Sequence, residues 1–328
     1  MKTIVYEKYG PPDVLHLADV ETPTPQDNEV LIKVHATSVT LYDCWMRSCT
    51  APPGFKLLMR IASGRTPKQP ILGTELSGEV EVVGKNVTGF KADDAVYGYP
   101  GMKLGAYAEH ICLPEEAVAL KPTNTTYAEA AAVLQGAMTA WFFLSKAEIQ
   151  PRQKVLIFGA SGGVGGYAVQ LAKHYFKAEV IGVCSTAKMA YVKSLGADHV
   201  IDYTLEDFTK NGQVYDVVFD TVGKTSVSRT KNSIKPNGWY LLATFGLPML
   251  IQLLLPMRNS NLNLEYGTLA ESTEDLLRVK ELVETGVIKP TIDRCYPLEQ
   301  TAEAHRYVES GQKMGNVILT VNQEDKND

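Results

Sequence analysis

The sequence lacks the features that would place the protein in a membrane or outside the cell. Its longest apolar run, residues 247–257, is eleven residues long with two prolines and a glutamine, too short to span a bilayer. Residues 1–6 alternate like a β-strand and do not resemble a signal or transit peptide. The five cysteines are scattered, with no Cys-x-x-Cys pair, which indicates reduced thiols. We therefore expect a cytoplasmic protein with no membrane span.

Charge and metal-ligand patterns are also weak. The formal net charge is −5 and no basic stripe is present, so nucleic acid is not expected as a partner. The six histidines form no cluster with metal-ligand spacing. The chain of 328 residues is long enough for two domains. The run 247–257 leaves four alternatives open: a core helix, an apolar lid, a subunit contact or a membrane-surface anchor.

One short stretch points to a ligand. A predicted buried strand, 155–158, leads into Gly159, Gly162 and Gly165, and helical spacing follows over 167–177. Glycines at this spacing serve a tight turn, close approach of a pyrophosphate and helix–strand packing. The alternative is a tight turn with no ligand. A further strand at the expected distance favours a dinucleotide.

The end of that second strand indicates which dinucleotide binds. An NAD site usually places an acid there for the ribose 2′-OH, but no acid lies between Glu179 and Asp198. Ser185, Thr186 and Lys188 occupy the place and suit a 2′-phosphate. The alternative is a solvated loop lysine. The sequence therefore favours NADPH as the cofactor.

The rest of the chain divides into three blocks. Residues 1–122 are strand-rich with frequent glycine and proline, typical of a small antiparallel barrel. A helix is predicted from residue 127, and strands then alternate with helices, which indicates a doubly wound parallel sheet. The tail predicts a strand, a helix and a final strand. The predicted strands are 30–36, 78–83, 155–158, 179–183, 199–201, 214–219, 240–243, 291–296 and 316–321, and the later helices are 273–285 and 298–310.

The chain resembles the medium-chain dehydrogenases/reductases, in their zinc-free quinone oxidoreductase (zeta-crystallin-like) branch. The resemblance implies an α/β fold, with a GroES-like barrel catalytic domain (1–123 and 287–328) around an NADP-binding Rossmann domain (124–286). It also implies a homodimer. Besides the glycine turn, the matching residues are Tyr9–Leu15, Ala130–Ala132, Thr139–Trp141, Leu195–Asp198, Val200–Tyr203, Phe219–Gly223, Tyr296–Leu298 and Ala304–Tyr307.

Departures from the zinc-dependent members predict that no metal is bound. Thr40 stands where those enzymes have the catalytic cysteine, and Thr74 replaces the histidine of their Gly-His-Glu triplet. Glu75 alone cannot hold zinc, which prefers sulfur and imidazole ligands. The four-cysteine lobe of the structural zinc has no counterpart between Phe90 and Glu109.

Without a metal to stabilise an alkoxide, the favoured reaction is hydride transfer from NADPH to a quinone or an α,β-unsaturated carbonyl. Two alternatives stay open: an alcohol or aldehyde dehydrogenase/reductase of the same superfamily, and a non-catalytic NADPH-binding regulatory or structural protein. The resemblance makes Tyr42 and Thr40 the candidate catalytic residues, as donors to the developing negative charge. The alternative is that Tyr42 packs against the nicotinamide or the core, with its hydroxyl satisfied. For Asp43 and Arg47 a structural salt bridge is favoured over chemistry.

The resemblance also implies a set of cofactor residues, in four groups. For two members of the last group, Phe245 and Leu269, the alternative is plain packing in the core. The groups are the pyrophosphate turn (Ser161, Gly162, Gly163 and Val164), the 2′-phosphate surroundings (Ser185, Lys188 and Tyr203), the nicotinamide side (Thr139 and Asn316) and the carboxyl edge of the last strands (Phe245, Leu269 and Ala270).

Overall fold

The computed structural model describes residues 1–50, 54–55, 60–61, 63–246, 262–267 and 272–321. The apolar run 247–257 and two predicted cofactor residues, Leu269 and Ala270, lie outside the described residues.

Most strands of the first block join one sheet that the C-terminal segment completes. Its order is β14-β15-β3-β4-β5-β7, and β6 also pairs with β3. Alternate residues of β3, among them Val30, Ile32 and Val34, are fully buried, as expected for a strand with one face on a core. The strands are β3 (Glu29–Ser38), β4 (Leu76–Val83), β5 (Ala95–Gly98), β6 (His110–Pro114), β7 (Val118–Leu120), β14 (Ile292–Pro297) and β15 (Asn316–Thr320), beside a separate hairpin of β1 (Lys2–Val5) and β2 (His16–Asp19).

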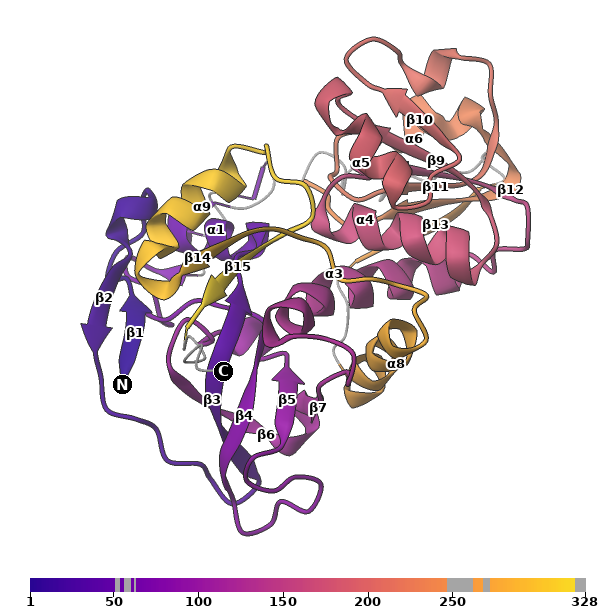
Figure 1. The fold of residues 1–328 in the computed structure, drawn as a ribbon. Helices are drawn as coiled ribbons and strands as arrows, with labels where there is room; N and C mark the ends of the chain where they lie inside the picture. Colours follow the sequence, from indigo (N-terminus) through magenta and orange to yellow (C-terminus); the bar gives the residue numbers. More distant parts are fainter. Residues whose placement is uncertain (51–53, 56–59, 62, 247–261, 268–271, 322–328) are drawn as a thin grey trace.

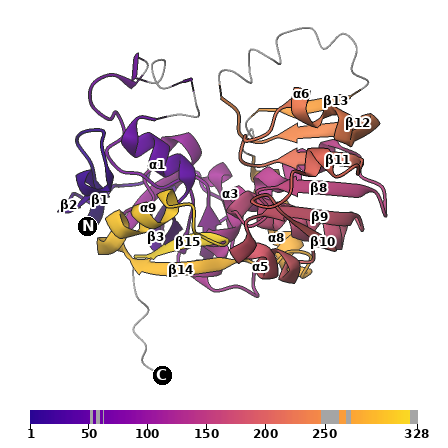
Figure 2. The ribbon, with the colours of Figure 1, turned by 90° about the horizontal axis from the view of Figure 1, so that it is seen from above.

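The long helix α3 (Tyr127–Lys146) lies between this sheet and the second one (Figures 1 and 2). The predicted capping box is confirmed: Thr126 Oγ1 accepts from Glu129 N, and the Glu129 carboxylate accepts from Thr126 N. The helix packs against β3 and β4 on one side and α4 on the other. Gly136 permits close contact with α4, because a Cβ there would lie 2.8 Å from the Tyr167 ring.

The second sheet is parallel, as predicted, with the order β10-β9-β8-β11-β12-β13 (Figure 2). Its central strands β8, β9 and β11 are mostly buried and apolar, which suits a sheet with helices on both faces. The elements are β8 (Lys154–Phe158), α4 (Gly163–Gln170), β9 (Glu179–Cys184), α5 (Met189–Ser194), β10 (His199–Asp202), β11 (Tyr215–Asp220), α6 (Val227–Thr230), β12 (Ile234–Leu242) and β13 (Asn263–Tyr266).

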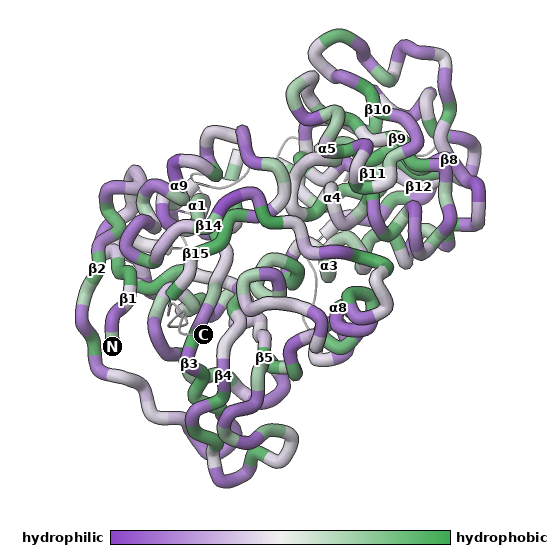
Figure 3. Tube along the Cα trace, viewed as in Figure 1, coloured by the Kyte–Doolittle hydropathy of each residue, from purple (hydrophilic) through white to green (hydrophobic). Residues whose placement is uncertain are grey.

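The chain then returns to the first sheet. Helix α8 (Thr273–Glu284) alternates hydrophobic and hydrophilic residues (Figure 3), and its apolar side, including Leu276 and Val279, is buried. Strand β15 pairs antiparallel with β3, so segments from opposite ends of the sequence lie side by side (Figure 1). Helix α9 (Thr301–Glu309) lies between β14 and β15 in sequence and packs against α1 (Leu41–Ser48).

Some predicted boundaries were wrong. The helix expected over 167–177 begins at Gly163 and changes to a π-helical turn over Leu171–Tyr175, so its hydrogen-bond register differs from that of a simple α-helix. Strand β12 begins at Ile234 rather than 240, because Ile234 pairs with Tyr215 of β11 and a register shift separates this pair from the next, Val217 and Trp239. Among the described helices, none is long and apolar enough to cross a membrane.

Candidate functional site

The glycine turn after β8 has the geometry that its sequence predicts. Gly159 adopts φ +84°, a left-handed conformation that favours glycine. A Cβ on Gly165 would lie 2.1 Å from the carbonyl oxygen of Gly159, so the turn and α4 pack together only with glycine there. Two of the three glycines are therefore required by the fold alone.

Gly162 has a different role, because it faces open space. A Cβ on Gly162 would meet only the carbonyl oxygen of Gly159, at 3.4 Å. Gly162 is the N-cap of α4 and supplies no side-chain cap, so the first N–H groups of the helix receive no side-chain hydrogen bond from their N-cap residue. Uncapped N–H groups and the helix dipole favour a phosphate, and the open space fits a pyrophosphate. Ser161, Gly163 and Val164 belong to the same turn.

The residues predicted to surround a 2′-phosphate lie at the carboxyl end of β9, where a neighbouring strand contributes an acid that sequence analysis missed. Asp202 ends β10 opposite Cys184, and the Thr186 hydroxyl donates to its carboxylate. Hydrogen bonds from Thr186 and Thr204 hold the pKa of Asp202 below its usual value. The sequence signal that could have found Asp202 is its place at the end of the next parallel strand, because neighbouring parallel strands end at the same edge of the sheet.

Lys188 also has partners in this structure. Its ammonium donates to the carbonyl oxygens of Gly311 (2.7 Å) and Lys313 (2.9 Å), in the loop between α9 and β15. The hydroxyls of Ser185 and Tyr203 make no hydrogen bond with any described residue, and Tyr203 is 56% exposed. These two hydroxyls are therefore available to a ligand.

The residues predicted for the nicotinamide side and for the carboxyl edge of the last strands lie in different surroundings. Thr139 is half-buried on α3. The Asn316 amide donates to the Tyr167 hydroxyl (3.2 Å), and its Oδ1 would lie 2.7 Å from a Cβ on Gly163. Asn316 therefore lies beside the glycine turn. Phe245 is half-buried and contacts the Tyr266 ring edge-to-face, with centroids 5.8 Å apart, and its role beside the cofactor stays a prediction.

Thr40, one of the two catalytic candidates, caps helix α1. Its Oγ1 accepts from Asp43 N and donates to Asp43 Oδ2 at 2.6 Å, while Thr40 N donates to the same oxygen. Gly73 N donates to the other carboxylate oxygen of Asp43 at 3.0 Å. Burial raises the pKa of Asp43 to about 6. The Thr40 hydroxyl thus already donates its proton in a hydrogen bond to the Asp43 carboxylate.

Tyr42 is half-buried and packs against the apolar cluster that contains Ile4 and Leu72, and its catalytic role stays a prediction. The predicted Asp43–Arg47 salt bridge is wrong. The buried guanidinium of Arg47 pairs instead with Glu309 of α9, because α1 and α9 pack together. That tertiary contact has no local sequence signal.

The positions compared with zinc ligands hold a buried carboxyl group. Glu75 is 2% exposed; it accepts from Ser38 Oγ and from Gln135 N, the latter at 2.7 Å. Burial raises the pKa of Glu75 to about 7. Thr74 Oγ1 is buried without a hydrogen-bond partner among the described residues. Within the same described ranges, no group of three His, Cys, Asp or Glu side chains is placed to hold a metal.

Sequence analysis also missed Lys313. This half-buried lysine precedes β15, and its ammonium donates to the carbonyl oxygen of Gly315 at 2.7 Å. A Cβ on Gly163 would lie 3.8 Å from Lys313 Nζ. A lone lysine in a polar loop gives no sequence signal of this position.

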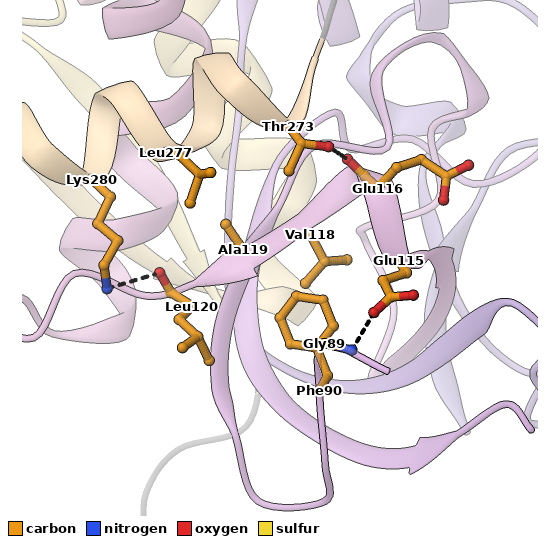
Figure 4. Close-up of a pocket in the computed structure, with 10 residues that line it drawn as sticks. All are labelled: Gly89, Phe90, Glu115, Glu116, Val118, Ala119, Leu120, Thr273, Leu277 and Lys280. Atoms are coloured by element: carbon orange, nitrogen blue, oxygen red, sulfur yellow. Dashed lines mark hydrogen bonds between the residues drawn. The ribbon is translucent and has the colours of Figure 1, made fainter. Parts of the chain in front are cut away.

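A pocket of about 490 Å³ lies elsewhere, between the β4–β5 loop, β7 and α8 (Figure 4). Its polar groups are largely engaged with one another: Glu115 accepts from Gly89 N, Thr273 donates to the carbonyl oxygen of Glu116, and Lys280 donates to backbone carbonyls. None of the predicted site residues that the structure describes lines this pocket. The candidate site is therefore the glycine turn and the residues around it.

Comparisons with known proteins agree with this fold. The family described as alcohol dehydrogenase GroES-like domain matches residues 26–123, and the one described as zinc-binding dehydrogenase matches 195–319. A 2-methylene-furan-3-one reductase of Solanum lycopersicum is 33% identical, over 97% of this chain and 79% of that protein.

Two solved structures are similar over nearly their whole length. The quinone oxidoreductase from Coxiella burnetii is 29% identical with a TM-score of 0.86, covering 98% of this chain and 99% of its own. The Escherichia coli quinone oxidoreductase, in complex with NADPH, is 27% identical with a TM-score of 0.83, covering 98% of this chain and 100% of its own. The chain belongs to the medium-chain dehydrogenase/reductase superfamily, in its quinone oxidoreductase branch.

Proposed function

We propose that the protein is a zinc-independent, NADPH-dependent reductase of quinones or α,β-unsaturated carbonyl compounds. The observation that carries the proposal is the open, uncapped N-terminus of α4 at Gly162, which fits a pyrophosphate. Threonine hydroxyls at positions 40 and 74 support zinc independence, because neutral hydroxyls are poor zinc ligands.

The proposed chemistry divides between cofactor and protein. The reduced nicotinamide supplies a hydride to an electron-poor carbon or oxygen of the acceptor. The protein holds donor and acceptor together and excludes water. It also donates a hydrogen bond or proton to the acceptor oxygen on which negative charge develops. We assign this donation to Tyr42. The Thr40 hydroxyl is the second candidate, and to donate it would have to give up its hydrogen bond to Asp43.

The preference for NADPH rests on the groups at the end of β9. Lys188 supplies a positive charge, and Ser185 and Tyr203 supply hydroxyls for a 2′-phosphate. Asp202 opposes this preference by its charge, but Thr186 and Thr204 donate to it. The similar Escherichia coli enzyme is in complex with NADPH, which supports the same choice.

The test is an acceptor screen with purified protein. We expect NADPH oxidation with benzoquinone and methyl vinyl ketone, little with simple aldehydes, and no NADP⁺ reduction with simple alcohols. Metal analysis should find less than stoichiometric zinc, and a chelator should leave the rate unchanged. Oxidation restricted to aldehydes, or loss of the rate with the chelator, would overturn the proposal.

The descriptions of the matching families favour a second candidate, an alcohol or aldehyde dehydrogenase/reductase. The same screen separates the two, because this candidate requires turnover of alcohols or aldehydes. Tight NADPH binding without oxidation by any acceptor would indicate instead a non-catalytic NADPH-binding protein.

The proposal extends to domain organisation and assembly. We assign residues 1–123 and 287–328 to a catalytic domain and 124–286 to a cofactor domain, in a cytoplasmic homodimer. Limited proteolysis should release a fragment close to 124–286, sedimentation should give twice the chain mass, and fractionation of cells should place the protein in the cytoplasm.

A further inference from the structure

The loop between α9 and β15 contacts two parts of the proposed cofactor site, the glycine turn and Lys188. Gly315 N donates to the carbonyl oxygen of Ser161 at 3.1 Å. The Lys188 ammonium donates to carbonyl oxygens of Gly311 and Lys313. We call residues 311–315 the tail loop. It therefore contacts both the turn proposed for the pyrophosphate and the lysine proposed for the 2′-phosphate.

The Lys313 ammonium faces this turn without a counter-ion. Its hydrogen bond is to the carbonyl oxygen of Gly315, and no carboxylate lies within 4 Å among the described residues. Asp293 of β14, whose charge acts on Lys313, accepts instead from Tyr307 and from Met314 N. Two N–H bonds of Lys313 thus remain for another acceptor.

The position of Lys313 determines which phosphate of the dinucleotide its ammonium can reach. Its ammonium lies close to Gly163, at the N-terminus of α4, where the open space over Gly162 fits the pyrophosphate. The 2′-phosphate is assigned to the end of β9, where Lys188 already stands. The two lysines therefore face different parts of the same ligand.

We propose that Lys313 binds the pyrophosphate of the dinucleotide from the tail loop, completing with α4 a site shared by both parts of the fold. This inference rests on the proposed function only in requiring a dinucleotide. Because NADH and NADPH share the pyrophosphate, Lys313 contributes to the affinity for both, whereas Lys188 contributes to NADPH alone.

Binding should also change the protonation of Lys313. Burial and the neighbouring Lys188 lower the pKa of Lys313 to about 8, against the opposing charges of Asp293, Cys44 and Glu75. An adjacent pyrophosphate stabilises the ammonium and raises this pKa. The protein should therefore take up protons when the dinucleotide binds at pH 8.5, and much less at pH 6.5.

The experiment measures dinucleotide binding without any acceptor. Fluorescence titration gives Kd values for NADPH and NADH with Lys313→Met, Lys313→Arg and, as a control, Lys193→Met, an exposed lysine of α5. We expect Lys313→Met to raise both Kd values about tenfold or more. Lys313→Arg should stay within a few fold of wild type, and Lys193→Met should change neither value.

Calorimetry of the wild-type protein in buffers of different ionisation enthalpy provides a measurement that needs no variant. Proton uptake at pH 8.5 that Lys313→Met abolishes supports the inference. Unchanged Kd values, a loss confined to NADPH, or binding without proton uptake would overturn it. A wild-type protein that binds neither dinucleotide would overturn the proposed function as well.

Discussion

The Lys188 ammonium lies 2.9 Å from the carbonyl oxygen of Lys313, so the side chain assigned to the 2′-phosphate holds the tail loop in this structure. A 2′-phosphate would have to displace this carbonyl and that of Gly311. The affinity gained from the phosphate is therefore reduced by two hydrogen bonds that the protein already makes.

Replacing Lys188 tests the cofactor assignment. We expect Lys188→Ala to raise the KM for NADPH about tenfold or more, because a charge-assisted hydrogen bond to a phosphate is lost. The KM for NADH should change little. Steady-state kinetics with both cofactors measure the ratio, and equal effects would refute the 2′-phosphate assignment.

The glycine turn offers a matched pair of substitutions. Gly162→Ala adds a Cβ in open space at φ −82°, so the melting temperature should hold while dinucleotide affinity falls about tenfold. Gly165→Ala places a Cβ 2.1 Å from a backbone oxygen and should destabilise the fold by roughly 1–3 kcal/mol. Thermal unfolding and binding titrations separate the effects. Loss of affinity without destabilisation in Gly165→Ala would contradict this division.

Burial of Glu75 makes stability depend on pH. Because burial raises the pKa of Glu75 from 4.5 to about 7, the folded state binds more protons than the unfolded state between these values. The contribution of Glu75 to the free energy of unfolding is therefore complete below about pH 4.5, and it is lost as the pH rises through about 7.

Glu75→Gln should remove the loss of stability that deprotonation of Glu75 causes, which is of the order of 3 kcal/mol. Relative to wild type, the variant should gain stability between pH 5 and pH 8, as measured by urea unfolding. Glu7→Gln, at an exposed glutamate, is the control and should leave the pH profile unchanged. A Glu75→Gln profile parallel to wild type would show that Glu75 does not titrate in this range.

Tyr42→Phe tests the proposed proton donor. We expect kcat to fall tenfold to about a hundredfold at unchanged NADPH affinity, because the phenol no longer stabilises the charge on the acceptor oxygen. An unchanged kcat would remove Tyr42 from the mechanism and leave it a packing residue.

Thr40→Ala should cost about 1 kcal/mol of stability through the lost cap of α1, and Thr40→Ser should restore it. Urea unfolding measures both variants. A Thr40→Ala variant as stable as wild type would show that the capping interaction contributes little.

The sequence predicted the elements whose signals are local. Five of the parallel strands were predicted from their apolar residues, and α3 from its capping box at Thr126 and Glu129. The sixth, β13, was missed, because it has only four residues and none of them is fully buried. Helix α1 was missed, because its cap pairs Thr40 with an aspartate rather than the usual glutamate or glutamine. The helix has only eight residues, too few for a clear periodicity.

Only the part of the candidate site that has a local sequence signal was predicted. The glycine turn is a contiguous motif, so its geometry could be anticipated. Asp202 comes beside Thr186 through strand pairing, and Lys313 comes beside Gly163 through the return of the tail. Arg47 meets Glu309 through helix packing. Such proximities depend on segments far apart in the chain, and one sequence does not encode them locally.

The pairing of β15 with β3 has a consequence for biosynthesis. Residues 36–38 of β3 emerge early from the ribosome, but their antiparallel partners, 318–320, are translated only after the whole parallel sheet. Until then that part of β3 exposes unpaired N–H and C=O groups, which invite association with other nascent chains. Of the two large sheets, the one that begins first along the chain is thus completed last.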